Sequence, residues 1–290
     1  MADYSIWVLE YGYVDQFPAS SLLAAQPHQG HRRMPYCFAL LRSAQRCILV
    51  DTGFANPAVH QRLTDKYGTT YWSSPVDVLD RVGVRAADVD AIVLTHNHLD
   101  HSGCVGAFPN AHVYVQRREL ARYADALALP SRFEFLLRAT DPALPDLLAA
   151  RDQVLRVTYA NGYLPVTDGI EVRPAFDTHT AGSQFALVDN AADGRWLFAG
   201  DNVYVYQNIE GIGGDGVLEP IGTSTGSQSV WLSCIDQALS WVGRDTGRVL
   251  PFHDSEVFRR FPSCCHADGL HVAEVSLAAG HQSVLTRPAT

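Results

Sequence analysis

Short apolar runs alternate with helical patterns along the whole chain. Runs rich in β-branched and aromatic residues, each bounded by turn residues, predict strands in both halves. They cover 5–14, 37–43, 46–53, 90–96 and 112–116, and then 170–176, 184–190, 195–201 and 248–254. Apolar positions three and four apart predict helices over 76–84, 117–129 and 230–244. Strands interleaved with amphipathic helices in both halves indicate an α/β layered fold.

The length of the chain and its even composition indicate the domain organisation. The 290 residues show no repeat, low-complexity tract or linker-like segment, so we expect one domain over 1–290. Residues 209–228 are rich in glycine and follow neither the strand nor the helix period. Long loops in compact domains are often functional, so we expect this one near the site.

Charge and cysteine content limit the partners and the compartment. The chain has 22 Lys and Arg against 31 Asp and Glu, a net charge of −9, and no basic cluster. We therefore expect a small-molecule substrate rather than nucleic acid or a membrane surface, and the sequence is compatible with a homodimer. Six cysteines without C-x-x-C spacing, no export signal and no apolar run of about 18 residues predict a cytoplasmic protein.

The stretch "THNHLDHSG", 95–103, places His96, His98, Asp100 and His101 directly after a predicted strand. Imidazole nitrogen and carboxylate oxygen suit zinc and similar divalent ions, and a rigid strand end fixes the direction of such ligands. The alternative is a polar turn with solvated histidines. Four such residues at this spacing favour the metal.

Three further ligand candidates follow predicted strands downstream. They are His179 in "AFDTHTAG", Asp201 in "LFAGD" and His253 in "LPFHD". Together with the first four they would complete a site for two ions. The remaining histidines are interpreted as polar surface or core residues.

This order of landmarks, from "ILVDTG" (51–53) through H-x-H-x-D-H to 253, resembles the metallo-β-lactamase superfamily. The resemblance implies an αβ/βα four-layer sandwich with two metal ions at one edge. It also implies that Asp51 supports the site, although a turn-forming Asp before Gly is an equal alternative. The implied ligands are His96, His98 and His179 for one ion, Asp100, His101 and His253 for the other, and Asp201 bridging both with a water or hydroxide.

Two divalent ions sharing a water lower its pKa enough to give hydroxide near neutrality, so hydrolysis is the expected chemistry. Zinc is the first expectation, with manganese, cobalt and iron as alternatives. "GTSTGSQS" lacks nucleophile-elbow spacing, and Cys264 and Cys265 lack a partner set, so neither serine nor cysteine catalysis is expected.

The branch of the superfamily is indicated by Tyr204, three positions after Asp201. This D-x-x-Y spacing resembles the N-acyl homoserine lactone lactonases, in which such a tyrosine points at the substrate carbonyl. The resemblance implies catalytic roles for Tyr204, Asp100 and Asp201. The alternative for Tyr204 is a strand residue packed in the core, with Tyr206 on the same face.

The expected function is a dinuclear metal-dependent hydrolase that opens a lactone or related cyclic ester or amide by attack of a metal-bridging hydroxide. The alternatives are a thioesterase of the glyoxalase II type and a mononuclear iron dioxygenase of the persulfide type. Without a basic cluster, uncharged or weakly charged substrates are expected.

Some positions depart from the lactonase pattern. Asp177 and Thr178 replace the usual Pro-Gly, and the loop 17–33 is poor in aromatic residues, which leaves the substrate open. His28 and His31 in that loop either reach the rim of the site or are solvated.

Overall fold

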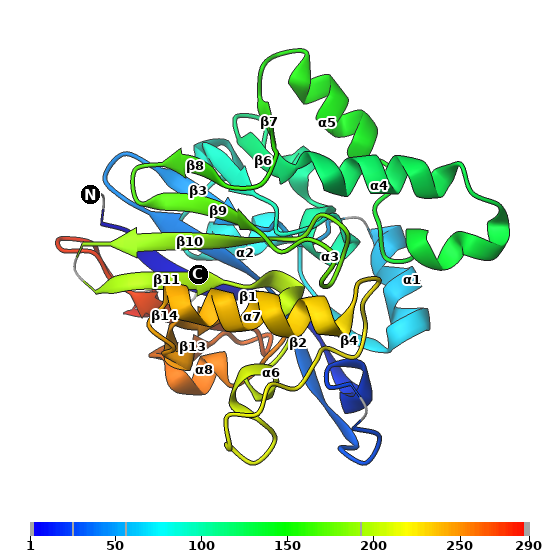
Figure 1. Ribbon diagram of the computed structural model, residues 1–290. Helices are drawn as coiled ribbons and strands as arrows, with labels where there is room; N and C mark the ends of the chain where they lie inside the picture. Colours follow the sequence, from blue (N-terminus) through cyan, green and yellow to red (C-terminus); the bar gives the residue numbers. More distant parts are fainter. Residues whose placement is uncertain (1–2, 25, 56, 192, 287–290) are drawn as a thin grey trace.

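The computed structural model describes residues 3–24, 26–55, 57–191 and 193–286. Within them, two β-sheets lie between outer layers of helices (Figure 1). Apolar side chains from both sheets belong to one buried cluster, so the core lies between the sheets. The predicted α/β class and the αβ/βα sandwich are thereby confirmed.

The larger sheet has nine strands in the order β13-β14-β1-β2-β3-β5-β6-β7, with β4 paired to β1. The strands are β1 (Ser5–Pro18), β2 (His31–Arg42), β3 (Cys47–Val50), β4 (Thr69–Trp72), β5 (Ala91–Val93), β6 (His112–Gln116), β7 (Val157–Ala160), β13 (Ser263–Cys265) and β14 (His271–Ser276). β3, β5, β6 and β7 run parallel to one another. Their carboxyl ends therefore meet at one edge.

The smaller sheet has five strands in the order β12-β11-β10-β9-β8. They are β8 (Leu164–Thr167), β9 (Ile170–Pro174), β10 (Gln184–Asn190), β11 (Gly194–Phe198) and β12 (Val249–Leu250). β11 and β12 are parallel, whereas β9 and β10 are antiparallel. The connection from β9 to β10 thus lies at the edge where β11 and β12 end.

Helices cover the outer faces. α2 (Pro75–Arg81), α4 (Arg117–Leu127) and α5 (Leu144–Asp152) contact the larger sheet. α7 (Gln228–Trp241) lies over the smaller sheet, and Trp241 packs edge-on against Phe185 of β10 (Figure 1). The remaining helices are α1 (Pro57–Tyr67), α3 (Leu99–Ser102), α6 (Gln207–Glu210) and α8 (Val257–Arg260). There are also 3-10 turns at Ala19–Ser21, Ala86–Asp88, Val105–Ala107, Ser131–Leu137, Gly200–Asn202, Thr246–Arg248 and Val284–Thr286.

The three predicted helices are confirmed as α2, α4 and α7. α1 and α5 were not predicted, because α1 is mostly polar in sequence and α5 buries only Leu144 and Leu148, too few positions to show a helical period. Several strands end earlier than predicted. β3, β5, β11 and β12 stop at Val50, Val93, Phe198 and Leu250. The polar residues that follow each strand therefore lie in loops.

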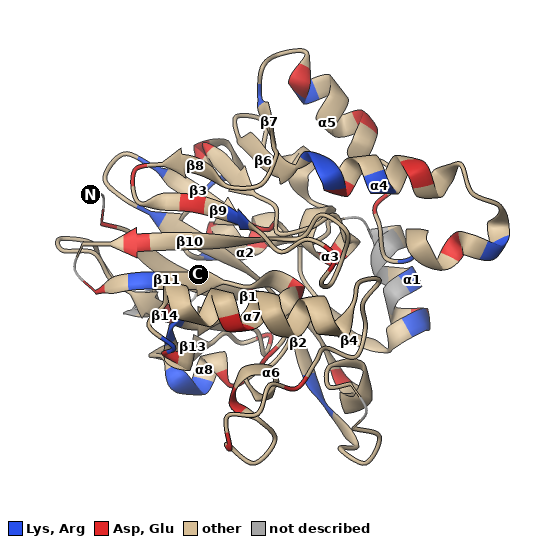
Figure 2. Ribbon diagram, in the orientation of Figure 1, with Lys and Arg blue, Asp and Glu red and all other residues tan. Residues whose placement is uncertain are grey.

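Charged residues are spread over the molecule. In Figure 2 the basic residues lie on several separated elements, with acidic residues between them. None of the described helices has both the length and the apolar character that a membrane span requires.

Candidate metal centre

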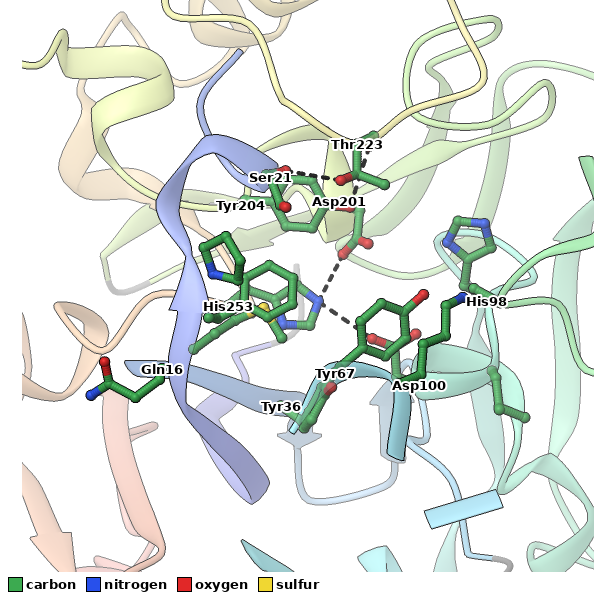
Figure 3. A pocket seen from close by; sticks show the side chains of 16 residues that line it. Gln16, Ser21, Tyr36, Tyr67, His98, Asp100, Asp201, Tyr204, Thr223 and His253 are labelled. Atoms are coloured by element: carbon green, nitrogen blue, oxygen red, sulfur yellow. Dashed lines mark hydrogen bonds and ion pairs between the residues drawn. The ribbon is translucent and has the colours of Figure 1, made fainter. Parts of the chain in front are cut away.

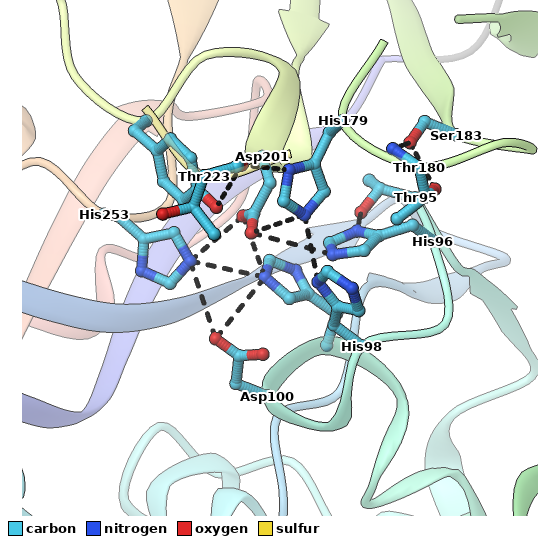
Figure 4. Close-up of polar contacts among 12 residues, drawn as sticks. Thr95, His96, His98, Asp100, His179, Thr180, Ser183, Asp201, Thr223 and His253 are labelled. Carbon is cyan, nitrogen blue, oxygen red and sulfur yellow. Dashed lines mark hydrogen bonds and ion pairs between the residues drawn. The ribbon is translucent and has the colours of Figure 1, made fainter. Parts of the chain in front are cut away.

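The first cluster of ligand-type side chains comprises His96, His98, His179 and Asp201 (Figure 4). His96 and His98 follow β5, whereas His179 comes from the β9–β10 connection. Nε2 of His179 lies 2.9 Å from Nδ1 of His98. Oδ2 of Asp201 lies 3.6 Å from Nε2 of His96 and 3.3 Å from Nε2 of His179. Side chains from both sheets thus converge at the shared edge.

The second cluster comprises Asp100, His101 and His253. Nε2 of His101 lies 3.3 Å from Nε2 of His253. Oδ2 of Asp100 is 3.8 Å from the former nitrogen and 3.7 Å from the latter. His253 follows β12, so this cluster also joins the two sheets.

Asp201 stands between the clusters. Its Oδ1 lies 2.9 Å from Nε2 of His101 and 3.0 Å from Nε2 of His253, while its Oδ2 faces the first cluster. Asp201 is in the 3-10 turn after β11, where Gly200 has a φ of 52°. A Cβ on Gly200 would lie 2.5 Å from Oγ1 of Thr95, so glycine permits the close approach that brings Asp201 to the histidines of the other sheet.

Hydrogen bonds at Nδ1 fix the orientation of three of the histidine rings. Nδ1 of His253 donates to the carbonyl of Pro35 at 2.8 Å, and Nδ1 of His179 donates to the carbonyl of Thr223 at 3.0 Å. Nδ1 of His101 lies 2.7 Å from Oδ2 of Asp51. Each Nε2 is thereby left as a lone-pair donor facing the cluster, the arrangement typical of metal-ligating histidines.

Asp51 supports the site. Its carboxylate also accepts hydrogen bonds from the backbone N–H and the hydroxyl of Thr95, both at 2.7 Å. The Thr95 hydroxyl lies 3.0 Å from Nδ1 of His96 and so links both clusters to Asp51. Asp51 itself has a φ of 62°, a strained conformation for a residue other than glycine, and such strain concentrates at functional sites.

Burial and charge divide the histidines into two sets. Burial lowers the pKa of His96 and His98, and lowers that of His179 to about 3. Burial also disfavours the charged form of His101 and His253, but the carboxylates, Asp201 foremost, outweigh it and raise the pKa of both rings. The first three rings therefore favour the neutral, lone-pair-donating form, whereas His101 and His253 hold a proton more tightly than an ordinary histidine does.

The residues present fit two divalent metal ions. Nε2 of His96 is buried without a hydrogen-bond partner among the described residues, and Oδ1 of Asp201 makes no hydrogen bond with them although it lies close to Nε2 of His101 and of His253. Leaving such atoms unsatisfied costs about 1–3 kcal/mol each, which a metal ligand bond would offset. All the donor atoms are nitrogen and carboxylate oxygen, the set that zinc and similar ions prefer.

A cavity of about 370 Å³ opens onto both clusters (Figure 3). Tyr204 lines it, with its hydroxyl 3.4 Å from the carbonyl oxygen of Thr223. Tyr206 does not share that position, because the chain leaves the strand at Phe198, and its ring packs under the guanidinium of Arg260 at 3.5 Å. The two tyrosines therefore have separate environments.

The loops predicted near the site behave differently. The glycine-rich loop 209–228 reaches the cavity through Thr223, as expected. The segment predicted as loop 17–33 is shorter in the structure, because β1 ends at Pro18 and β2 begins at His31. It reaches the cavity through Phe17 at the end of β1 and Ser21 in the next turn, but His28 and His31 are exposed and do not line the cavity.

Sequence reasoning missed Glu119 and Lys66. Glu119 is buried in the first turn of α4 and bonds to both histidine-bearing loops of the first cluster. Its position just after strand 112–116, at the same edge as the other candidates, was the available signal. Lys66 lines the cavity from α1, a helix that the sequence pattern did not reveal.

A sandwich of two sheets with paired His/Asp clusters at their common edge defines a metal-binding α/β protein. The chain belongs to the metallo-beta-lactamase superfamily, whose family model matches residues 35–253. All seven candidate ligands lie within the matched stretch.

Several of the proteins similar to this chain are lactonases. An N-acyl homoserine lactonase of Bacillus cereus is 29% identical over 185 residues, which cover 60% of this chain and 66% of the relative, just under two thirds of its length. A crystal structure of a quorum-quenching N-acyl homoserine lactone lactonase has a TM-score of 0.67 at 23% identity, covering 89% of this chain and 95% of that one. AidC, a dizinc quorum-quenching lactonase in complex with a product, has a TM-score of 0.64 at 18% identity, covering 96% and 97%. These structures share the fold.

Proposed function

We propose that the protein is a dinuclear metal-dependent hydrolase that opens a lactone or a related cyclic ester or amide. The observation that carries this proposal is the position of Asp201, whose two carboxylate oxygens face different clusters within hydrogen-bonding distance of three imidazoles. A carboxylate so placed is suited to bridge two ions. The curated relatives, N-acyl homoserine lactonases, support the choice of a lactone.

The ligand assignment rests on the two clusters. His96, His98 and His179 would hold one ion, Asp100, His101 and His253 the other, and Asp201 both. When bound, the ions supply an activated water and polarise the substrate carbonyl. The presence of a complete second cluster favours this hydrolase over the mononuclear iron dioxygenase.

Tyr204 would act on the substrate directly. Burial first, and then the nearby carboxylates of Asp201 and Asp100, raise the pKa of Tyr204 well above its usual value, so the phenol stays protonated. A protonated phenol at the cavity wall can donate to a carbonyl oxygen that gains negative charge during ring opening. A donor that binds the transition state more strongly than the ground state accelerates the reaction.

We also propose zinc as the resident metal, because its preferred ligands are those present. Six free thiols support a cytoplasmic location. A homodimer is the assembly to test first, since Phe133 and Phe135 expose apolar rings on the Ser131–Leu137 turn.

The test is a panel of lactones, thioesters, cyclic amides, β-lactams and bis(p-nitrophenyl) phosphate, assayed with protein of known metal content. We expect the lactones to have the highest kcat/KM and chelation to abolish turnover. A higher kcat/KM for thioesters would establish the glyoxalase II type of activity instead. Turnover of the phosphodiester above that of every lactone would refute the proposal.

A further inference from the structure

Lys66 is the only lysine in the sequence, and it lines the cavity of the metal centre. It lies in the last turn of α1, and its ammonium nitrogen is 4.4 Å from the centroid of the Tyr67 ring, which lines the same cavity. Figure 3 shows the side chains that line this cavity, among them Tyr67 of α1, Gln16 of β1 and Ser21 of the 3-10 turn that follows β1. Among the described residues that line the cavity, no arginine accompanies Lys66.

The ammonium group of Lys66 has no carboxylate within 4.0 Å among the described residues. Several arginines elsewhere have such partners, for example Arg33 with Glu10 and Arg46 with Asp90. Asp100 and Asp201, the acidic residues of the lining, are directed at the histidine clusters. A single positive charge is thus presented to the cavity without a counter-ion from the protein.

Lys66 shares its cavity with the metal centre. His98 of the first cluster and His253 of the second line the same cavity as Lys66. A small substrate inside this space of about 370 Å³ can therefore contact both the clusters and the ammonium group.

We propose that Lys66 is a specificity-determining residue that binds a carboxylate on the side chain of the substrate. This inference rests on the proposed lactone hydrolysis and specifies its substrate as an acid-bearing lactone. An unpaired cation at a cavity wall attracts anions and discriminates against neutral analogues. One compact ammonium suits one carboxylate, whereas a phosphodiester would call for the planar fork of arginine or several cations.

The aromatic and apolar part of the lining fits the remainder of such a molecule. Phe17, Met34 and Tyr67 can pack against a short hydrocarbon linker. The linker would run from the ring, held at the clusters, to the carboxylate at Lys66. A long, purely aliphatic acyl chain would instead place apolar carbon beside an unpaired ammonium, which costs free energy of desolvation.

The experiment compares two γ-lactones that share one linker and end in a carboxylate or in the isosteric carboxamide. We expect the parent enzyme to favour the carboxylate in kcat/KM by about tenfold. One charge-assisted hydrogen bond would account for this preference, and partial exposure to solvent keeps the effect of that bond from being larger. Lys66→Gln should abolish the preference chiefly through KM, and Lys66→Arg should retain most of it. Arg259→Gln makes the same charge change on exposed α8 and should leave the preference unchanged.

A second measurement does not depend on turnover. Calorimetry with the corresponding cyclic ethers, which cannot be hydrolysed, should show about tenfold tighter binding of the carboxylate to the parent and equal binding of both compounds to Lys66→Gln. Rising ionic strength should reduce the difference in the parent.

The outcomes separate the two proposals. If both lactones are opened with equal kcat/KM by the parent and by Lys66→Gln, the inference about Lys66 is overturned and lactone hydrolysis stands. If neither lactone is opened while the ethers show the Lys66-dependent preference, the anion site stands and the proposed reaction falls.

Discussion

The carboxylate of Glu119 accepts a hydrogen bond from the backbone N–H of Gly182 over an N–O distance of 2.6 Å. The same carboxylate accepts from the backbone N–H of Asn97 at 3.1 Å and from the hydroxyl of Thr180 at 2.9 Å. Asn97 stands between His96 and His98, and Thr180 follows His179. One buried side chain therefore fixes both loops of the first cluster, and through them the spacing of three candidate ligands.

Glu119→Gln should loosen the first cluster. The amide keeps one oxygen acceptor but directs an NH₂ group at donors, so we expect a loss of roughly 2–3 kcal/mol in the free energy of unfolding. Metal content should fall below two ions per chain, measured by elemental analysis after dialysis. Glu134→Gln, at an exposed position, is the matched control and should stay within about 0.5 kcal/mol of the parent. Full metal content in both variants would contradict the positioning role.

Gly182→Ala tests the same contact from the other side. A Cβ at Gly182 would lie 2.2 Å from the backbone nitrogen of Glu119, closer than real Cβ atoms approach, and backbone cannot yield as a flexible side chain can. We expect a variant that is destabilised by more than about 2 kcal/mol in denaturant unfolding. Gly213→Ala is the control, since nothing lies within 4 Å of its Cβ. Equal stability of the two variants would show that the α4 contact is dispensable.

The ligand candidates could be found in the sequence because each follows a recognisable apolar run. The supporting contacts could not, because the carbonyl groups of Pro35 and Thr223 bond to His253 and His179 through backbone, which has no sequence signature. The position of Lys66 in the cavity could not be predicted for another reason. It enters the cavity from a polar helix, and only the tertiary fold shows which side chains of such a helix face the site.

Strand ends were the least predictable feature of the fold. The predicted strands over 46–53 and 195–201 continue past the last paired residues, Val50 and Phe198. The chain leaves the sheet there because Asp51 and Gly200 have positive φ values, which a run of hydrophobic residues does not reveal. The layered fold itself depends on periodicity and was therefore accessible.

Metal binding should release protons. A histidine must be neutral to bind a metal, and the carboxylates around His101, Asp201 foremost, outweigh its burial and hold its pKa well above the usual value, so the ring keeps its proton to higher pH than an ordinary histidine. Affinity should therefore rise with pH, by about tenfold per unit for each proton released, until pH passes that raised pKa. His179, with a pKa of about 3, should contribute nothing near neutrality. Calorimetry in buffers of different ionisation enthalpy counts the protons, and a count of zero would contradict this assignment.

Asp201→Ala and His253→Ala should differ in their effect on the metals. Asp201 faces both clusters, so its removal should weaken both ions, whereas His253 belongs only to the second cluster. We expect about two ions in the parent, about one in His253→Ala and less than one in Asp201→Ala after equal dialysis. A parent that holds only one ion under saturating metal would contradict the dinuclear proposal.

Tyr204→Phe tests the tyrosine at the cavity wall. The change keeps the ring, which packs 5.6 Å from the centroid of the His179 ring and 5.5 Å from that of His253, and removes only the donor. Loss of one transition-state donor lowers turnover by roughly 10²–10³, and a metal that shares the charge would bring the loss nearer tenfold. The fall should appear in kcat and kcat/KM together, with metal content and thermal stability close to those of the parent.

Tyr206→Phe is the matched control for Tyr204→Phe, because the structure places the two tyrosines in different environments. The Tyr206 hydroxyl is buried without a hydrogen-bond partner among the described residues, and its ring lies beneath Arg260 rather than in the cavity lining. Removing that hydroxyl therefore breaks no hydrogen bond seen in the structure, and kcat should stay within about twofold of the parent. If Tyr206→Phe were crippled and Tyr204→Phe fully active, the wrong tyrosine would have been chosen. If both variants were fully active, ring opening would proceed without a phenol donor and the metal centre would stabilise the developing charge alone.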